Sequence, residues 1–146
     1  MKIQDILNVK GTRVWTIRAS ETIQEALHRL VTHKIGALLV TDDRAENIIG
    51  IFSERDVVHG SYGSSKSLRE TRVYEWMTHE VFSCSPSDDV STVMSVMTEK
   101  RVRHVPVEEG GELLGLVSIG DVVKSTLEES QHQIQHLKEY VFGNFV

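Results

Sequence analysis

The segment from Lys100 to Lys124, KRVRHVPVEEGGELLGLVSIGDVVK, holds the pattern from which the fold can be predicted. It begins with four basic or titratable side chains: Lys100, Arg101, Arg103 and His104. Two apolar runs follow, and the Glu-Glu-Gly-Gly stretch between them is typical of a hairpin turn. A helix is predicted to begin at Ser118, and the free N–H groups and dipole of a helix start attract anions. The sequence therefore predicts a phosphate-binding surface where the basic residues meet this helix.

The same pattern occurs twice in the chain. Residues 14–40, VWTIRASETIQEALHRLVTHKIGALLV, align without a gap with residues 81–107, and residues 50–58, GIFSERDVV, align with residues 115–123, GLVSIGDVV. Each copy predicts a strand, a helix, two strands and a second helix, because a helical apolar periodicity precedes two short apolar runs around a turn. We therefore expect an α/β (α+β) fold of two tandem β-α-β-β-α repeats.

The first helix of each copy is expected to bury one face. Apolar residues within 23–31 and within 90–97 follow the i, i+3, i+4, i+7 spacing of an amphipathic helix. Short polar side chains that can accept hydrogen bonds from the first helical N–H groups precede both segments. The candidate N-caps are Ser20 or Thr22 in the first copy and Ser87 or Asp89 in the second.

These patterns divide the chain into four segments. They are a first repeat with its N-terminal lead-in (residues 1–60), a flexible Gly/Ser-rich linker (61–72), a second repeat (73–125), and a C-terminal helix and tail (126–146). A lead-in also recurs, because residues 3–7 resemble residues 73–77. One compact module made of two similar halves is therefore expected.

The C-terminal segment predicts a long helix with one apolar stripe. The stripe residues are spaced alternately four and three apart: Val123, Leu127, Ser130, Ile134, Leu137 and Val141. This is the spacing of a helix that packs lengthwise on another. A second chain could cover the stripe, and so could the helix's own domain. Because isologous dimers are the commonest oligomers, we predict a homodimer.

Composition excludes several classes of protein. A formal net charge of -5 over 146 residues argues against a general nucleic-acid binder, which needs a strongly basic face. No apolar run approaches the length of a membrane span, and the N-terminus lacks the continuous apolar core of a signal peptide. Cys84 is the single cysteine, so an intrachain disulfide and a cysteine-based zinc site are excluded. We expect a soluble, cytoplasmic protein.

With two such units in tandem, the sequence resembles a CBS-domain pair, also called a Bateman module. The resemblance rests mainly on Gly-h-h-Ser-x-x-Asp, where h is apolar, which occurs as Gly50–Asp56 and again as Gly115–Asp121. It implies two repeats related by a pseudo-twofold axis, with two clefts that bind adenosine-containing ligands such as AMP, ATP, NAD(H) or S-adenosylmethionine. It implies no catalytic cofactor. Bound AMP, NAD(H) or another adenosyl ligand is expected.

The resemblance also implies a set of nucleotide-binding residues. The Asp of each motif would hold ribose hydroxyls, the Ser and nearby basic residues would meet phosphate, and the first strand of each repeat would line the adenine pocket. The candidates are Ser53, Arg55, Asp56, Arg103, His104, Pro106, Ser118, Asp121, Trp15, Thr16, Ile17, Gly36, Ala37, Phe82 and Ser83. A carboxylate suits vicinal hydroxyls because it accepts two hydrogen bonds at once.

Each signal also has a simpler interpretation. Ser-x-x-Asp can be a capping device that satisfies the first N–H groups of a helix. Arg103 and His104 replace Gly36 and Ala37 of the first repeat, which favours a phosphate-binding role, but a solvated edge would look the same. His132 and His136 stand four apart on the last helix without a third ligand, so a solvated face is favoured over a metal site.

The pseudo-twofold arrangement predicts two unequal clefts. The cleft with Ser53 and Asp56 would also receive Arg55 and, from the second repeat, Arg103, His104 and Pro106. The cleft with Ser118 and Asp121 would receive Gly36, Ala37 and Leu39, with Gly120 in place of Arg55. The first cleft is expected to bind AMP more tightly, and the second to suit a larger or less charged compound such as NAD(H).

The leading hypothesis is a non-catalytic regulatory module that binds adenine nucleotides and signals to an unidentified partner protein. Neither a P-loop nor a G-x-G-x-x-G motif occurs, and no recognisable nucleophile or metal set accompanies His104. The alternative is a ligand-free dimerisation or interaction scaffold, in which the Ser-x-x-Asp pairs are helix caps. No nucleic-acid or membrane partner is expected.

Overall fold

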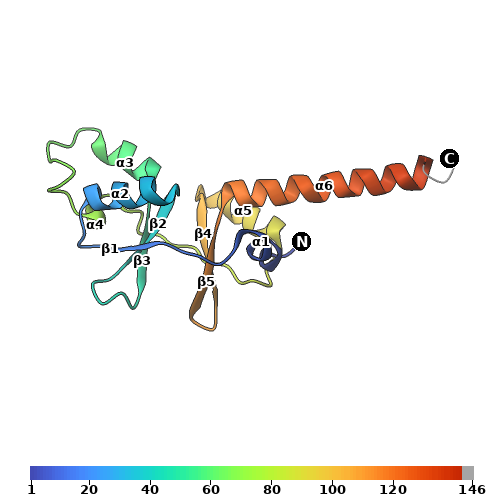
Figure 1. Ribbon diagram of the computed structural model, residues 1–146, viewed down its shortest axis with the longest axis horizontal. Helices are drawn as coiled ribbons and strands as arrows, with labels where there is room; N and C mark the ends of the chain where they lie inside the picture. The colour runs from blue at the N-terminus through green and yellow to red at the C-terminus, as the bar shows by residue number, and fades with distance from the viewer. Residues whose placement is uncertain (143–146) are drawn as a thin grey trace. The chain divides into compact units, whose positions relative to one another are not determined.

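The computed structural model describes residues 1–142, which form two compact units (Figure 1). Arg13–Phe82 form one, here called the central unit. Met1–Thr12 and the chain from Ser83 onward form the other, here called the terminal unit because it contains the N-terminal segment and the C-terminal helix. Each unit contains a small sheet with helices beside it, so the predicted mixed α+β class is confirmed.

The central unit contains a three-stranded sheet. Its elements are β1 (Thr16–Arg18), α2 (Ile23–His33), β2 (Ala37–Thr41), β3 (Ile48–Ser53), α3 (Glu54–Ser61) and α4 (Val73–Trp76). Strand β2 lies in the middle, parallel to β1 and antiparallel to β3. Thr22 is the N-cap of α2, and its hydroxyl accepts from the Glu25 N–H at 3.2 Å, which confirms one of the two predicted caps. The strand, helix, hairpin and helix follow the predicted order.

The terminal unit repeats this plan with a shorter sheet. Its elements are α1 (Ile3–Lys10), α5 (Val90–Lys100), β4 (His104–Glu109), β5 (Glu112–Ser118) and α6 (Ile119–Phe142). Strands β4 and β5 are antiparallel, and Gly110 and Gly111 both have positive φ in the turn between them. The first strand predicted for this repeat is reduced to one parallel bridge between Cys84 and Val107. Burial raises the pKa of the Cys84 thiol to about 11, as expected for a packing residue.

Each lead-in packs on the body of the other repeat. The Ile3 N–H donates to the Asp88 carbonyl oxygen at 3.0 Å in the terminal unit. The Val73 N–H donates to the Glu21 carbonyl oxygen at 2.8 Å in the central unit. Ile3 corresponds to Val73, and Asp88 to Glu21, in the two alignments of the sequence. The predicted segment 1–60 therefore does not pack as one piece, because its first twelve residues join the second repeat.

The glycine of each Gly-h-h-Ser-x-x-Asp motif makes room for this exchanged lead-in. A Cβ atom on Gly115 would lie 2.7 Å from a methyl carbon of Leu7, and one on Gly50 would lie 2.7 Å from the Met77 sulfur. The Gly50 position also faces the Thr78 carbonyl oxygen, 2.8 Å from where a Cβ would stand. Leu7 and Met77 occupy equivalent places in the two lead-ins. A side chain at either glycine would therefore separate lead-in and strand.

The linker predicted over residues 61–72 is ordered in its second half. The Gln24 N–H donates to the Leu68 carbonyl oxygen at 3.1 Å, and the Thr71 hydroxyl donates to the Ser67 carbonyl oxygen at 2.8 Å. Thr71 is almost completely buried, and its own carbonyl oxygen accepts from the Ile23 N–H at 2.9 Å. Residues 67–72 of the predicted linker therefore contribute to the start of α2, because their carbonyl oxygens accept from its first N–H groups.

Helix α6 runs without a break from Ile119 to Phe142, so the predicted segment boundary at residue 126 falls inside it. Its first turns contact α1, α5 and β5. All residues from Ser130 to Phe142 are exposed, and the remainder of the predicted segment, 143–146, lies outside the described residues. Across residues 1–142, no helix combines the length and the apolar character needed to cross a membrane.

Candidate functional site

The terminal unit has one candidate site where β5 leads into α6. The Ser118 N–H donates to Asp121 Oδ2 at 2.8 Å, and the Asp121 N–H donates to Ser118 Oγ at 3.2 Å. This is a reciprocal capping box that satisfies two backbone donors at the helix start. The Ile119 N–H donates to the Arg103 carbonyl oxygen at 2.8 Å, which fixes the end of β4 against the start of the helix. The motif therefore has the capping role weighed in the sequence analysis.

Lys10, which the sequence analysis did not select, completes this site. Its Nζ atom lies 2.6 Å from Asp121 Oδ2 and donates to the Leu116 carbonyl oxygen at 2.8 Å. Burial raises the pKa of Asp121, but the hydrogen bonds from Lys10 and Ser118 outweigh burial, and the net result is a pKa below the ordinary value. The Asp121 carboxylate is therefore ionised at neutral pH.

His104 lies opposite Ser118 in the β4–β5 ladder and is partly buried. Burial is the largest cause that lowers the pKa of His104, and the nearby charges of Lys10 and Arg103 lower it further, while Asp121 raises it. The imidazole is therefore neutral at pH 7 in the free protein. Pro106 pairs with Leu116 two residues along β4 and is buried.

The terminal unit thus brings five chemically relevant side chains to one junction: Lys10, Arg103, His104, Ser118 and Asp121. By family symmetry, Arg103 and His104 were assigned to the cleft of Ser53 and Asp56, which was expected to be the more cationic of the two clefts. Lys10, which was not among the candidates, adds a positive charge beside Asp121 from the lead-in. The repeat of the lead-in was visible in the sequence, but its exchange between repeats was not.

The central unit has the corresponding junction where β3 leads into α3. The Ser53 N–H and hydroxyl both donate to Asp56 Oδ2, at 2.8 and 3.3 Å. The Thr78 hydroxyl donates to Asp56 Oδ1 at 3.1 Å, so this carboxylate meets a neutral group of the exchanged lead-in where Asp121 meets Lys10. Arg55 is exposed on the first turn of α3.

Gly36 and Ala37 belong to this central-unit junction as predicted. Ala37 pairs with Ser53 in the β2–β3 ladder, and the Gly36 carbonyl oxygen accepts from the Glu54 N–H at 3.2 Å. Ala37 is buried, whereas Gly36 is partly exposed. The two residues therefore hold the start of α3 against β2.

The first-strand candidates differ in what they offer a ligand. Trp15 stacks on His33, with ring centroids 3.4 Å apart and an angle of 11° between the planes, and the Arg13 guanidinium lies 5.5 Å from the Trp15 ring centroid. One face of the indole is therefore already covered. Thr16 is exposed beside Leu39, but Ile17 is a core residue, so its side chain does not line a surface pocket. Phe82 and Ser83 stand where the chain passes from one unit to the other.

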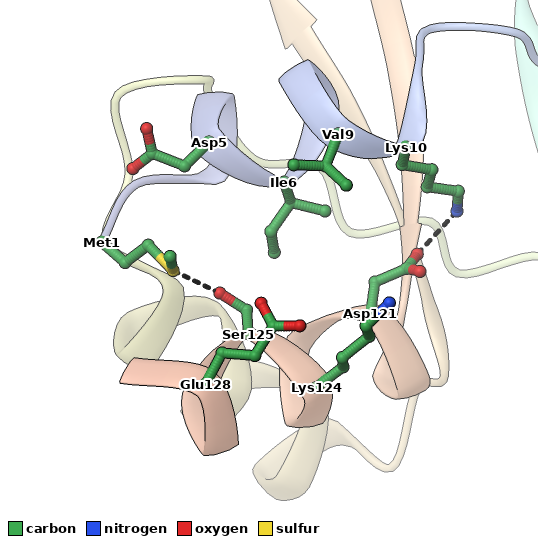
Figure 2. A pocket seen from close by; sticks show the side chains of 9 residues that line it. All are labelled: Met1, Asp5, Ile6, Val9, Lys10, Asp121, Lys124, Ser125 and Glu128. Carbon is green, nitrogen blue, oxygen red and sulfur yellow. Dashed lines mark hydrogen bonds and ion pairs between the residues drawn. The ribbon is translucent and has the colours of Figure 1, made fainter. Parts of the chain in front are cut away.

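A pocket of about 330 Å³ lies between α1 and α6 of the terminal unit (Figure 2). The ion pair of Lys10 and Asp121 forms one end, and the contact between Met1 and Ser125 forms the other (Figure 2). Its lining residues are Met1, Asp5, Ile6, Val9, Lys10, Asp121, Lys124, Ser125 and Glu128. The volume is near the lower limit for small-molecule sites. A rearrangement of the ion pair would change this pocket as well as the junction.

The remaining candidates do not form a metal site. His132 and His136 are exposed on α6, and within residues 1–142 no three metal-binding side chains of the His, Cys, Asp and Glu types come together. The acidic residues of the two junctions are held instead by N–H groups, hydroxyls and Lys10. The chemistry that these junctions offer is therefore hydrogen bonding and charge.

Comparisons with known proteins agree with the repeat. The family model described as the CBS domain matches residues 4–63 and 73–128. The chain is 30% identical to the CBS domain-containing protein CBSX3, mitochondrial, of Arabidopsis thaliana, over 98% of this chain and 73% of that protein. It is 41% identical to the solved CBS-domain containing protein ATU1752 from Agrobacterium tumefaciens, with a TM-score of 0.81 over 86% of this chain and 99% of that one.

A third similarity concerns the fold alone. The CBS domain pair of protein MJ0100 was solved in complex with 5'-methylthioadenosine and S-adenosyl-L-methionine. It is 22% identical to this chain, with a TM-score of 0.75 over 88% of this chain and 98% of that one. The two molecules therefore share the tandem architecture at low sequence identity.

Proposed function

The chain belongs to the CBS-domain family, and from this membership we propose that it is a regulatory module whose two strand-to-helix junctions bind adenosine-containing compounds. The observation that carries the proposal is the double occurrence of one arrangement. In both units the Asp of Gly-h-h-Ser-x-x-Asp is held at a helix start by its Ser and by a residue of the exchanged lead-in. Adenosine compounds also occupy the solved pair of MJ0100, which supports this ligand class.

The terminal-unit junction suits a phosphorylated ligand. Asp121 is ionised, and its Oδ1 atom can accept from a ribose hydroxyl while Oδ2 keeps the helix cap. Lys10 and Arg103 supply positive charge next to it, and His104 adds a third cation when protonated. Charge-assisted hydrogen bonds to phosphate are the strongest that such side chains make. We therefore propose that AMP or ATP binds here in preference to an uncharged nucleoside, which reverses the assignment by family symmetry of the tighter AMP site to Ser53 and Asp56.

The central-unit junction is less cationic around its carboxylate. Both oxygens of Asp56 accept hydrogen bonds, from Ser53 and from the neutral Thr78. Arg55 is the basic residue of this motif, on the exposed side of the helix start. This junction is expected to hold the ribose of a larger or less charged compound, such as NAD(H) or S-adenosylmethionine. The ligands act as effectors, and no catalytic cofactor is proposed.

The ion pair of Lys10 and Asp121 provides a way to signal occupancy. It connects α1 to α6, so a ligand that draws Lys10 toward its phosphate, or engages Asp121, alters the contact between these helices. A ligand shifts a conformational equilibrium by the difference in its affinity for the two states. A regulated partner protein that touches α1 or α6 would then sense the bound nucleotide.

The scaffold hypothesis is supported by one specific observation, the reciprocal cap between Ser118 and Asp121. If capping is the whole role of the motif, Asp121→Asn should lower stability by at most about 1 kcal/mol, through loss of the ion pair with Lys10 and a weaker cap, without affecting nucleotide binding. If the carboxylate also binds ribose, the same variant should lose affinity while retaining its fold by circular dichroism.

Isothermal titration calorimetry tests the proposed function. The wild-type protein is titrated with AMP, ATP, NAD(H) and S-adenosylmethionine, and saturable heat with at least one of them is expected. A positive result is then repeated with Asp56→Asn and Asp121→Asn to assign the junction. Absence of binding for all four compounds at millimolar concentration would contradict the proposal and leave the scaffold hypothesis.

A further inference from the structure

Helix α6 extends beyond the rest of the terminal unit (Figure 1). We propose that α6 pairs with α6 of a second copy of this chain as a parallel two-stranded coiled coil over residues 123–141. From the sequence alone, either another chain or the helix's own domain could cover the apolar stripe. The structure bears on this choice, because it shows which face of α6 its own unit uses.

The terminal unit contacts α6 on faces other than that of the apolar stripe residues. Val122 and Ser125 are buried, and Asp121, Lys124 and Glu128 line the pocket beside α1. Thr126, Ser130 and Gln133 line a second pocket beside the start of α5, so the polar residue Ser130 is the member of the stripe that borders its own unit. At 100° per residue, the stripe that contains Leu127 and Ile134 points away from α1. Its apolar residues are 42–62% exposed: Val123, Leu127, Ile134, Leu137 and Val141. Burial by the helix's own unit therefore does not explain the stripe.

The stripe has the heptad pattern of a coiled coil. Leu127, Ile134 and Val141 occupy a positions, and Val123, Ser130 and Leu137 occupy d positions. In the C-terminal half of the stripe, Ile134 and Val141 at a with Leu137 at d match the combination that favours two parallel strands over higher oligomers, whereas Leu127 at a and Val123 at d do not. The single polar layer at Ser130 disfavours other registers, because a shift of one heptad would place each serine against an apolar residue.

The flanking charges favour the parallel orientation. Lys124 and Lys138 occupy e positions, and the g positions hold the neutral residues Thr126, Gln133 and Tyr140. In an antiparallel pair e faces e, so Lys124 of one helix would lie beside Lys138 of the other, and like charges repel. In a parallel pair e faces g, and Lys138 meets the amide of Gln133 instead. In the parallel arrangement each stripe residue packs against the same residue of the other helix, so the partner that covers the stripe is a second copy of this chain.

The segment also needs a partner for stability. Residues 130–142 are all exposed, although Ser130 and Gln133 border a pocket beside the start of α5. The side-chain hydrogen bond described within this segment joins Gln135 to Glu139 of the same helix. Isolated helices of about 12–15 residues are only marginally stable in water, because forming the first turn is unfavourable and a short helix gains few hydrogen bonds to offset that cost. Pairing along the seam removes the exposed side chains from water and stabilises both helices together.

Sedimentation equilibrium of the full chain at micromolar concentration tests the pairing. The wild type is expected to be a dimer. The seam variant Ile134→Glu/Leu137→Glu should raise the dissociation constant by at least about tenfold, equivalent to about 1.4 kcal/mol. The matched control His132→Glu/His136→Glu changes exposed residues on the other face of the same helix and should remain dimeric. Both variants lie beyond the body of the unit, so its circular dichroism and melting should be preserved.

Disulfide trapping tests the orientation. Leu137→Cys places a thiol at a d position, which faces itself in a parallel pair and lies far from itself in an antiparallel pair. Oxidation should give a covalent dimer, and the wild type with buried Cys84 should give none. A monomeric wild type, or a seam variant as dimeric as the control, would overturn the proposal. A dimer that Leu137→Cys does not trap would overturn the parallel orientation, and a monomer whose seam binds a different protein would overturn the choice of a second copy.

Discussion

Lys10 of α1 and Asp121 of α6 form an ion pair at 2.6 Å although 111 residues separate them in the chain. The contact exists because the N-terminal lead-in packs on the second repeat. It places a cation beside the carboxylate that would hold a ribose. The equivalent carboxylate, Asp56, meets the Thr78 hydroxyl instead. The two junctions therefore differ in charge through their lead-ins as well as through their strands.

The first prediction concerns this ion pair. Lys10→Met should raise the pKa of Asp121, because the hydrogen bond from Lys10 is the largest of the effects that lower it. The pair is partly exposed, so the free energy of unfolding should fall by at most about 1 kcal/mol. The pKa can be followed by NMR titration of the Asp121 carboxyl carbon. Lys2→Met removes the more exposed pair with Asp89 and should leave Asp121 unchanged; an equal response to both variants would contradict the assignment.

A second prediction concerns pH and His104. The pKa of His104 is below its ordinary value of 6.5 in the folded protein, so the unfolded state binds more protons between these two values. Stability should therefore be lost as the pH falls from about 6.5 toward the folded pKa. His104→Gln should reduce this loss, measured by urea unfolding at pH 7.5 and below 6, and His132→Gln at an exposed position should not. A profile in which stability rises as the pH falls through this window would contradict the assignment.

The third prediction concerns the motif glycines. Gly50→Ala should destabilise the protein by about 1–3 kcal/mol, because the new Cβ would stand 2.8 Å from the Thr78 carbonyl oxygen as well as near Met77. Gly115→Ala should cost less, because its contact is the end of the Leu7 side chain. Gly120→Ala is the control, since its nearest neighbour would be Ser118 Oγ at 3.6 Å. Thermal unfolding should rank the variants in this order, and a destabilised Gly120→Ala would show that contact with the lead-in is not the cause.

A fourth prediction tests the cations of the terminal unit with AMP. Arg103→Ala should weaken AMP binding about tenfold or more, because a hydrogen bond to a charged group contributes about 1.5–3 kcal/mol. Arg44→Ala, at an exposed residue of the central-unit turn, should bind as the wild type does. Calorimetry of the two variants measures the difference. If Arg103→Ala bound AMP with unchanged affinity, Arg103 and His104 would be a solvated edge and not a phosphate site.

The fold was predictable because the repeat is visible in the sequence. The helical periodicity of residues 23–31 and 90–97, together with the turns, gave the order of the elements in both units. The length of the first strand of the second repeat was overestimated, because only Cys84 pairs there, in a single bridge to Val107. An apolar pattern predicts that a segment is extended and buried, but hydrogen-bond partners decide whether it becomes a strand.

The site was predictable only in part. The motif residues Ser53, Asp56, Ser118 and Asp121 were found because they repeat, and the structure gives each pair a cap. Lys10 was missed because an alignment of repeats shows which segments are alike, whereas packing decides which segments touch. Ile17 was predicted as an adenine-pocket residue from its place in the first strand. Side chains alternate between the two faces of a strand, and that of Ile17 points into the core.

An amide NMR titration with AMP tests whether the strand-to-helix junctions are the ligand sites. The largest shifts are expected at the amides of residues 118–121 and 53–56, which lie at the two helix starts, and Lys10 in α1 should respond as its ion pair rearranges. Shifts confined to other parts of the chain, or none at millimolar AMP, would contradict this assignment.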